Sequence, residues 1–370
     1  MRRLAESSSA NKLSSIERGA LVHFVVPGDI NSLTGGYIYD KHMISGLEHE
    51  GLAVKLHLLE PEFPLPSGSA LGNAAAAIGK ISDGEVVIVD GLALGPLHKI
   101  LEVHRHRLKI VGLIHHPLAD ETGLRIDVAK KLGEAERQAL SFCRTVVVTS
   151  QITRSTLVHK YDVRGEKICV IEPGVKRGCV FSPRLRGGLR LICVASLIPR
   201  KGHSTLVEAL SLLADRSWDL ICIGDLHRDP RTSVRIRNLV RKFGLTHRIK
   251  FVGEVSEARL QEHYHKASLF VLASHHEGYG MALSEAISWG VPVVSTTGGA
   301  IPFTVPQAAS LLVQPGDARA LSYAIGRFMD EPRTRVKLLA GARGASGKQT
   351  SWLFATSRFV AVIRRVVCDE

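Results

Sequence analysis

The sequence lacks any apolar run of about 18 residues, the length that a membrane-spanning helix needs. Residues 1–18 are polar and rich in serine, without the apolar segment that a signal peptide carries. We therefore predict a flexible polar tail over 1–18, no transmembrane segment and a cytoplasmic protein. Peripheral contact with a membrane stays open, because such contact needs no spanning helix.

Metal-binding patterns are also missing. The sequence has no Asp-x-Asp and no His-x-x-x-His motif, although it has two pairs of adjacent histidines, His115–His116 and His275–His276. We expect no metal site and reduced, buried thiols. The cysteines show no paired metal-ligand spacing and several lie in apolar runs: Cys143, Cys169, Cys179, Cys193, Cys222 and Cys368.

Aromatic residues are scarce, at 5% of the chain, whereas the net charge is +13. Residues 1–180 hold 22 Lys and Arg against 20 Asp and Glu, a net of +2; residues 181–370 hold 26 against 15, a net of +11. No recognised nucleic-acid-binding motif accompanies these basic residues, so a nucleic-acid partner is not expected. A negatively charged small ligand bound by the second half accounts for the asymmetry.

Short apolar runs alternate with helical patterns along nearly the whole chain of 370 residues, a length that suits two domains. Gly, Pro, Asp or His follow most of the runs, as expected where buried parallel strands end in functional loops. We predict an α/β fold of two Rossmann-like doubly wound domains facing a central cleft. The expected strands are 21–26, 54–59, 86–89, 109–114, 145–149, 168–171, 189–194, 218–223, 249–251, 269–273 and 291–295.

The domain boundary is expected in 174–188, where Gly, Pro and Arg interrupt the pattern. One Rossmann-like domain would span 19–175 and the other 176–350. After a loop-like stretch, 341–351, the segment 351–370 has an amphipathic helical pattern. Periodicity leaves open whether this helix packs on its own domain or crosses back to the N-terminal one. Helices are also expected at 39–51, 129–142, 204–214, 233–243 and 281–289.

The most informative stretch is 269–294, LFVLASHHEGYGMALSEAISWGVPVV. An apolar strand runs into Glu277, and a helix begins near Met281 and contains Glu285. Gly278 and Gly280 let the backbone approach a ligand and expose amide donors at a helix N-terminus. The two carboxylates can accept hydrogen bonds from hydroxyl pairs on a sugar and a ribose. The structural alternative makes Glu277 a cap residue and Glu285 a solvated helix charge.

EGYGMALSE resembles the Glu-x7-Glu signature of retaining glycosyltransferases of the GT-B fold, in particular glycosyltransferase family four. The glycines, the aromatic residue and the following Ala-Ile-x-x-Gly-Val-Pro-Val-Val agree in position. Other blocks that resemble this family occur in the expected order: TGGY (34–37), VASLIPRKG (194–202), CIGD (222–225) and FVGEV (251–255).

The resemblance implies a role for each matching residue. Glu277 would hold hydroxyls of the transferred sugar and Glu285 the nucleotide ribose. Lys201, with Arg200, would neutralise the diphosphate as charge develops on it. Catalytic roles fall to His115, Glu277 and Lys201. The residues implied to bind the donor are Gly35, Gly36, Arg200, Lys201, Gly253, Glu277, Gly278, Tyr279, Gly280, Met281 and Glu285.

Three positions depart from the family pattern. Ser196 stands where the family usually has an Arg, so we expect Arg200 to replace that phosphate contact. Phe303 follows the Gly-Gly-x-Pro turn, where the family often has an acid. Residues 173–176 read Pro-Gly-Val-Lys in place of Asn-Gly-Val-Asp. These changes affect donor identity and fine geometry more than the fold.

His115 ends an expected apolar strand, where a histidine is more often structural than catalytic. The resemblance places a histidine of this strand end beside the donor sugar and the acceptor, and His115 matches it better than His116. We expect its ring to project into the cleft opposite Glu277. Residues 120–122, Asp-Glu-Thr, are expected in a solvated loop, with an acceptor pocket as the alternative.

The predicted function is retaining, metal-independent transfer from a nucleoside diphosphate sugar to an acceptor hydroxyl. A UDP-sugar is favoured over a GDP-sugar, no further cofactor is required, and the acceptor is a small molecule, glycan or lipid. The 19–175 domain would bind the acceptor and the 176–350 domain the donor. Alternatives are a sugar-nucleotide epimerase, a phosphorylase-like enzyme of the same architecture, and a non-catalytic sugar-nucleotide-binding protein. Intact Glu277, Glu285 and Lys201 favour an enzyme.

Overall fold

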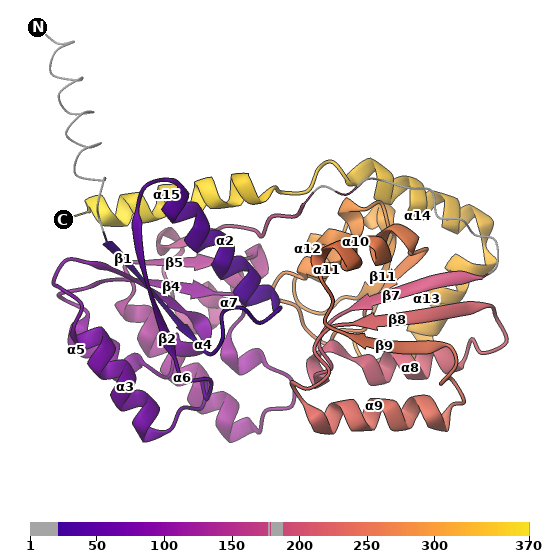
Figure 1. The fold of residues 1–370 in the computed structure, drawn as a ribbon, viewed down its shortest axis with the longest axis horizontal. Coiled ribbons are helices and arrows are strands. Elements are labelled where there is room, and N and C mark those ends of the chain that lie inside the picture. The colour runs from indigo at the N-terminus through magenta and orange to yellow at the C-terminus, as the bar shows by residue number, and fades with distance from the viewer. Residues whose placement is uncertain (1–20, 177, 179–187, 370) are drawn as a thin grey trace, which may run out of the picture.

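The computed structural model describes residues 21–176, 178 and 188–369. The expected tail, 1–18, most of the expected boundary stretch and Cys179 lie outside these residues. Within the described part, the strands form two six-stranded sheets, one in each half of the chain (Figure 1). We call the part built on the first sheet the N-terminal domain and the part built on the second sheet the C-terminal domain.

The N-terminal sheet is parallel, with the strand order β2-β1-β3-β4-β5-β6. The order changes direction between β1 and β3, which makes the carboxyl ends of these strands the expected place for a ligand. Its strands are β1 (Leu21–Pro27), β2 (Ala53–Leu59), β3 (Val86–Asp90), β4 (Lys109–Ile114), β5 (Thr145–Val148) and β6 (Ile168–Val170).

The C-terminal sheet is also parallel and has the order β12-β11-β10-β7-β8-β9. Here the direction changes between β7 and β10, so the loops that follow these two strands meet at the switch point. Its strands are β7 (Leu189–Val194), β8 (Trp218–Ile223), β9 (Ile249–Gly253), β10 (Leu269–Val271), β11 (Val293–Thr296) and β12 (Ser310–Val313).

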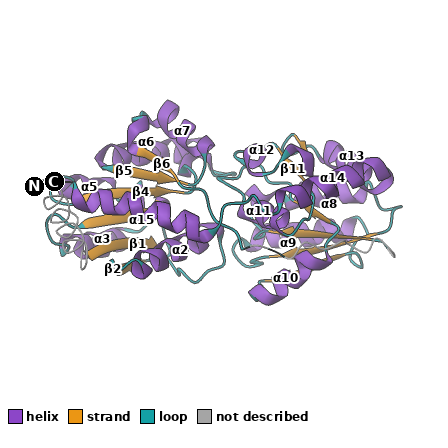
Figure 2. Ribbon diagram, turned by 90° about the horizontal axis from the view of Figure 1, so that it is seen from above, coloured by secondary structure: helices purple, strands orange, loops and turns teal. Residues whose placement is uncertain are grey.

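Helices flank both sheets, and the two domains lie side by side along the long axis of the molecule (Figure 2). The helices of the first half are α2 (Gly35–His49), α3 (Gly68–Gly79), α4 (Gly91–Leu94), α5 (His98–His104), α6 (Ile126–Phe142) and α7 (Gln151–Tyr161), with 3-10 turns η1 (Leu118–Asp120) and η2 (Gly165–Lys167). The remaining elements are η3 (Pro199–Lys201), α8 (His203–Ser211), α9 (Pro230–Lys242), α10 (Glu257–Lys266), α11 (Met281–Ser288), α12 (Ile301–Thr304), η4 (Gln307–Ala309), α13 (Ala318–Asp330), α14 (Pro332–Ala345) and α15 (Trp352–Cys368).

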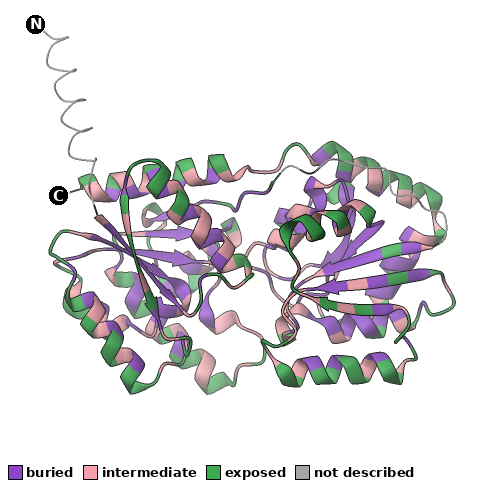
Figure 3. Cartoon of the chain, in the orientation of Figure 1, coloured by how far each residue is buried: buried purple, intermediate pink, exposed green. Residues whose placement is uncertain are grey.

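The strands are apolar over most of their length because both faces of each sheet are covered. In β1, Val25 joins a buried cluster on one face, and Val22 and Phe24 join a second cluster on the other face. The C-terminal sheet and its helices share one large buried cluster. Buried residues accordingly concentrate along the strands and on the inner sides of the helices (Figure 3).

The helix α15 packs on the N-terminal domain, although the residues before it belong to the C-terminal one (Figure 1). Phe359 and Ile363 are fully buried in the same cluster as Phe24. The chain therefore passes between the domains twice, and the two passages touch, since Val175 pairs with Ser351. No helix in the described ranges is long and apolar enough to cross a membrane.

Three expectations from the sequence were wrong. β12 (Ser310–Val313) was not expected, and residues 341–345, expected as a loop, continue α14. Cys368 is exposed and Cys169 is partly exposed, so the expectation of buried thiols fails for these two. Cys143, Cys193 and Cys222 are buried as expected.

Candidate functional site

The loop after β10 carries Glu277, which is only 5% exposed. This loop leads into α11 through Gly280, whose φ of +93° favours glycine. Among the residues that the structure describes, no side chain caps the N-terminus of α11. The first amides of the helix are therefore available to oxygen atoms of a ligand.

Glu277 is held by side chains from two loops of the switch point. Lys201, which ends η3 after β7, donates through Nζ to Oε1 and Oε2 of Glu277 at 2.7 and 2.9 Å. The Ser274 hydroxyl donates to Oε1 at 2.6 Å. The backbone carbonyl of Glu277 accepts from the Ala300 N–H at 2.8 Å. These contacts fix the carboxylate at the carboxyl-terminal edge of the strands of the C-terminal sheet.

Arg200 lies on the other side of Glu277. Its Nη1 donates to the backbone carbonyl of His276 at 2.9 Å and lies 3.7 Å from Oε2 of Glu277. The Arg200 carbonyl in turn accepts from the His275 N–H at 2.7 Å. Two cations therefore flank one buried carboxylate, a basic arrangement suited to a ligand that carries phosphate groups.

An acid from the N-terminal domain completes this ion-pair network. Nε of Arg200 donates to both carboxylate oxygens of Glu121, at 3.0 and 3.1 Å. Glu121 also pairs with Nε2 of His116 at 3.3 Å. The expectation of a solvated loop at 120–122 is therefore wrong for Glu121, which contacts the C-terminal domain.

The surrounding cations keep both acids ionised. Burial alone would raise the pKa of Glu277, but the charges of Lys201 and Arg200 lower it to about 2. Burial would also raise the pKa of Glu121, but the hydrogen bond from His116 and the charge of Arg200 lower it to about 2. Both carboxylates are thus hydrogen-bond acceptors at neutral pH.

Glu285 lies one turn into α11, where the hydroxyl of Tyr264 donates to its Oε2 at 3.0 Å. Burial raises the pKa of Glu285 to about 7, against the hydrogen bond from Tyr264, which lowers it. Tyr264 comes from α10 and stacks on Trp289 with ring centroids 6.4 Å apart. Glu285 is therefore partly enclosed, which contradicts the alternative of a solvated helix charge.

The two domains touch beside this site. A Cβ at Gly278 would lie 2.1 Å from the backbone oxygen of His115, so only a glycine fits there. A Cβ at Gly35 would lie 3.4 Å from the sulfur of Met281. The glycine-rich turn at the start of α2 and the N-terminus of α11 therefore face each other directly.

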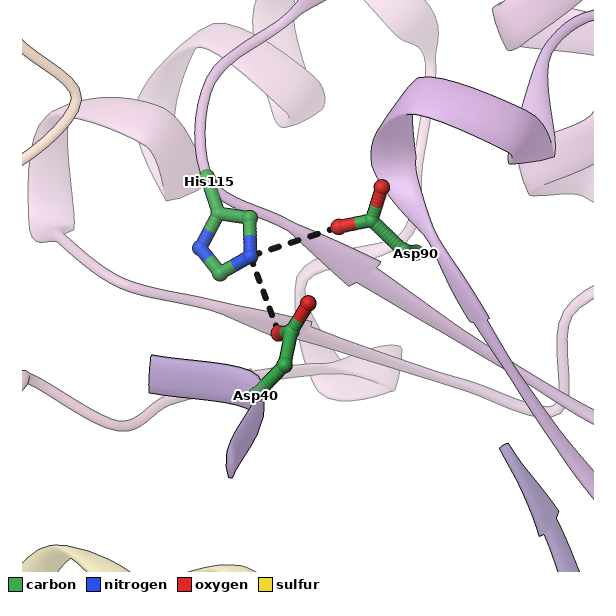
Figure 4. A group of neighbouring side chains, drawn as sticks. All are labelled: Asp40, Asp90 and His115. Carbon is green, nitrogen blue, oxygen red and sulfur yellow. Dashed lines mark hydrogen bonds and ion pairs between the residues drawn. The ribbon is translucent and has the colours of Figure 1, made fainter. Parts of the chain in front are cut away.

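The side chain of His115 adopts a different orientation from the expected one. Its Nε2 lies 3.1 Å from Oδ1 of Asp40 and 3.4 Å from Oδ2 of Asp90, both in its own domain (Figure 4). A Cβ at Gly36 would lie 3.2 Å from the ring. The side chain is 19% exposed, so the ring is turned largely into the N-terminal domain instead of projecting across the cleft.

Two predicted residues lie at the edges of the site. Gly253 ends β9 with a φ of +74° and accepts, through its carbonyl, from the Gly224 N–H at 3.0 Å. Tyr279 lines a cavity of about 660 Å³ together with Phe303 and Glu172.

Ser196 lies in the turn after β7, next to Gly224. Arg200 is thus the basic residue in this turn that faces Glu277, in addition to Lys201.

Sequence reasoning missed Asp40, Asp90 and Ser274. Asp90 is the last residue of β3, directly after the apolar run 86–89, a signal of the same kind as the one that drew attention to His115. Asp40 lies three residues from both Tyr37 and Met43 on the buried side of α2, so a carboxylate on an apolar stripe was the available signal. With His115 these aspartates place three possible metal ligands within 4.8 Å of one another, a cluster that no sequence spacing indicates.

Residues 184–344 match the family model of glycosyl transferases group 1. The MMP alpha-(1->4)-mannosyltransferase of Mycolicibacterium hassiacum is 25% identical over 321 residues, which cover 82% of this chain and 76% of that protein. A D-inositol 3-phosphate glycosyltransferase of Corynebacterium glutamicum is 24% identical over 288 residues, 71% of this chain and 68% of the relative.

Solved structures show the same fold. Sucrose-phosphate synthase from Thermosynechococcus elongatus superposes with a TM-score of 0.78 at 20% identity, covering 94% of this chain and 99% of the other. The Anabaena protein HepE in complex with UDP-glucose gives a TM-score of 0.74 at 17% identity, covering 93% and 99%. The two-sheet arrangement is therefore the GT-B fold, as the sequence predicted.

Proposed function

This chain belongs to the group 1 glycosyl transferases, a family of retaining enzymes with the GT-B fold that transfer a sugar from a nucleoside diphosphate sugar to an acceptor; we propose that its donor is a UDP-sugar bound between Glu277, Lys201 and Arg200. The observation that carries the proposal is the meeting of these three side chains at the switch point of the C-terminal sheet. HepE, which has the same fold, was solved with UDP-glucose, and this supports the choice of base.

In this proposal the C-terminal domain binds most of the donor. Lys201 and Arg200 face the diphosphate, and the backbone N–H groups of Gly278 to Met281 donate hydrogen bonds to its oxygens or to those of the sugar. Glu277 accepts hydrogen bonds from sugar hydroxyls, for which its low pKa suits it. Glu285 accepts from the ribose hydroxyls. Gly35 and Gly36 lie opposite, next to Met281 and His115, and the absence of side chains would let their backbone approach the phosphates closely.

Lys201 and Arg200 would act most strongly as the sugar–phosphate bond breaks. Negative charge then accumulates on the departing diphosphate, and fixed cations in a site shielded from water stabilise that charge. The acceptor oxygen bonds to the anomeric carbon on the face that the diphosphate leaves, and its proton passes to a phosphate oxygen. This front-face displacement retains the anomeric configuration and needs no covalent nucleophile.

The positive charge that the diphosphate requires comes from side chains, so we propose that the reaction is independent of metal ions. We also propose that residues 19–175 bind the acceptor and 176–350 the donor. Cys143, Cys169, Cys193 and Cys222 are free thiols, which supports a cytoplasmic location. The acceptor is a hydroxyl compound of a class that the proposal leaves open.

A thermal-shift panel of UDP-, GDP- and ADP-glucose tests the donor. A ligand that binds the native state raises the melting temperature, and we expect the largest rise with the UDP-sugar. A larger rise in melting temperature with GDP- or ADP-glucose would mean that the donor carries guanosine or adenosine in place of uridine. Product analysis with and without a mixture of hydroxyl acceptors then separates transfer from epimerisation, because an epimerase changes the sugar nucleotide without any acceptor.

A further inference from the structure

The helix α15 (Trp352–Cys368) carries three arginines and no acidic residue. Arg364 pairs with Glu50 of the N-terminal domain at 3.2 Å. Arg358 and Arg365 are exposed, and neither forms an ion pair with any residue that the structure describes. Their positive charges are therefore available to a negatively charged ligand.

Both unpaired arginines lie on one face of α15. Phe354, Arg358, Ala361 and Arg365 recur every three or four residues, the spacing that places side chains on one side of a helix. All four line a cavity of about 700 Å³. Phe359 belongs to a different face of the helix and is buried in the core of the domain. Thus α15 packs on the domain with one face and presents another to the cavity.

The floor of this cavity is β6, the edge strand of the N-terminal sheet. Leu157 of α7 and Phe359 of α15 belong to the two buried clusters on opposite faces of the sheet, so the cavity lies between these helices along the sheet edge. The N–H of Ile171 donates to the Val148 carbonyl at 2.9 Å. Because backbone groups of successive strand residues point to opposite sides, the N–H of Val170 points to the open edge and adds a donor to the floor.

The wall opposite α15 is α7, which contributes Arg154. One nitrogen of this guanidinium, Nη2, donates to the Gly165 carbonyl at 3.4 Å, and the side chain has no acidic partner within the described ranges. The residues that line the cavity therefore include three arginines and one acid, Glu172. An anion bound among the three guanidinium groups would be attracted by all of them.

We propose that this cavity binds a small phosphorylated compound, whose phosphate groups pair with Arg154, Arg358 and Arg365. The planar guanidinium matches phosphate oxygens through paired hydrogen bonds. A phosphate monoester carries about two negative charges at neutral pH, whereas a single carboxylate would leave most of the positive charge uncompensated. Arg358 and Arg365 lie about 10 Å apart along the helix, which suits a compound with a phosphate group at each end.

The apolar part of the lining favours a compound with a carbon skeleton over an inorganic ion. The ring of Phe354 is 55% exposed and lines the cavity with Val362 and Val170. The arginines line a hollow between two helices, which suits a dissolved molecule better than a flat membrane surface.

This site is separate from the proposed donor site. Lys201 and Arg200 belong to the C-terminal domain, whereas the cavity is built from α7, β6 and α15 on the N-terminal domain. Glu172 and Thr350 line one end of the cavity, next to the two passages of the chain between the domains. A compound bound there would join α15 to the strand and helix on which it packs.

Alkylation of Cys169 reports occupation of the cavity, because this thiol lines it and is partly exposed. Fructose 1,6-bisphosphate is the probe, fructose the uncharged control, and the exposed Cys368 the internal reference. At millimolar concentration the bisphosphate should slow the reaction of Cys169 with N-ethylmaleimide at least fivefold and leave Cys368 unchanged, as measured by mass spectrometry of the peptides. Equal rates at Cys169 with and without the bisphosphate would overturn the proposal.

The double variant Arg358→Gln, Arg365→Gln tests the arginines. It should abolish the protection of Cys169 and raise the Kd for the bisphosphate at least tenfold in calorimetry. Both side chains are exposed, so the variant should melt near the wild type. Arg333→Gln with Lys337→Gln removes two exposed positive charges from α14 and should bind as the wild type does. Equal weakening in this control would assign the binding to overall charge and refute the proposed site.

The donor site and lipid are excluded by separate measurements. Protection of Cys169 should persist in Lys201→Ala and in saturating UDP; its loss in either would place the probe at the donor site and contradict the proposal. Vesicles of phosphatidylglycerol should give no protection. Protection by vesicles but not by the bisphosphate would replace the small compound with a lipid surface. If UDP does not bind at all, the proposed donor is wrong, yet the alkylation of Cys169 still decides this proposal.

Discussion

Arg200 of the C-terminal domain donates through Nε to both carboxylate oxygens of Glu121 in the N-terminal domain, at 3.0 and 3.1 Å. The guanidinium that we propose to hold the donor diphosphate thus has a carboxylate that competes for the same hydrogen-bond donors. This pair joins the domains beside the site, and its carboxylate would repel an incoming phosphate.

We expect Glu121→Gln to bind UDP more tightly, because the substitution removes a negative charge next to Arg200. A threefold to tenfold fall in Kd corresponds to about 0.7–1.4 kcal/mol. Calorimetry with UDP measures it, with the exposed Glu166→Gln as the control. Equal or weaker binding in Glu121→Gln would show that the diphosphate does not use Arg200.

Lys201→Ala should both weaken UDP and destabilise the fold. Glu277 is 5% exposed and receives two hydrogen bonds from Lys201, so the variant leaves a buried carboxylate with fewer partners. Breaking such a pair costs about 3–5 kcal/mol in the free energy of unfolding. Urea denaturation and calorimetry check the two effects, with the exposed Lys131→Ala as the control.

Adding Glu277→Gln to Lys201→Ala should restore part of the lost stability, because the second substitution removes the unpaired charge, while UDP-glucose binding stays impaired. Wild-type affinity for UDP in Lys201→Ala would contradict the assignment of Lys201 to the diphosphate.

Gly278→Ala should separate the domains without damaging either one. A Cβ at this position would lie 2.1 Å from the backbone oxygen of His115, and its closest neighbours are backbone atoms that cannot rotate away. We expect a larger radius of gyration by X-ray scattering, near-normal UDP affinity and at least tenfold slower transfer. Gly72→Ala on α3 is the control, since nothing lies within 4 Å of its Cβ. An unchanged radius and rate would contradict the prediction.

Glu136 should make the protein less stable as the pH rises. Burial raises its pKa to about 8, against the hydrogen bond from the Leu118 N–H, so the folded protein keeps a proton that the unfolded chain loses near pH 4.5. The free energy of unfolding therefore falls between about pH 4.5 and 8, by at most about 1.4 kcal/mol per pH unit, and the loss ends above pH 8.

Urea denaturation at pH 5, 7 and 9 measures this effect. Glu136→Gln, which cannot ionise, should lack that part of the decline and should exceed the wild type in stability at pH 9. The exposed Glu134→Gln on the same helix should decline as the wild type does. Parallel stability curves for wild type and Glu136→Gln would mean that Glu136 is already ionised at neutral pH.

Turnover should survive an excess of EDTA, because Lys201 and Arg200 neutralise the diphosphate. The measurement is sugar release from UDP-glucose before and after chelation. Complete loss of activity that magnesium or manganese restores would contradict metal independence. Binding of the restoring ion to Asp40→Asn would then show whether the cluster of Asp40, Asp90 and His115 is where it acts.

Much of the fold could be predicted because its strands are buried on both faces. Every expected strand overlaps one in the structure, and 109–114, 189–194 and 218–223 agree at both ends. β12 was missed because it is a run of four residues, Ser310–Val313, too short to stand out from a buried loop. Helix starts were less certain, as for α2, which begins at Gly35 where glycines argue against a helix.

The site could be predicted only where one segment carries it. Glu277, Gly278 and Glu285 belong to one strand–loop–helix unit, and the Glu-x7-Glu resemblance identifies them. The pairing of Glu121 with Arg200 depends on how the domains face each other, which no local pattern contains. The orientation of the His115 ring depends on Asp40, and these two residues lie 75 positions apart in the sequence.

The return of α15 to the first domain has a consequence for synthesis on the ribosome. Phe359, Ile363 and Val366 fill the core beneath β1, so the N-terminal domain exposes an apolar surface until these residues have been translated. Roughly 180 residues separate β6 from α15, which at about 5–20 residues per second is on the order of ten to forty seconds. During that interval the nascent domain has a binding surface for chaperones, and the completed chain removes it.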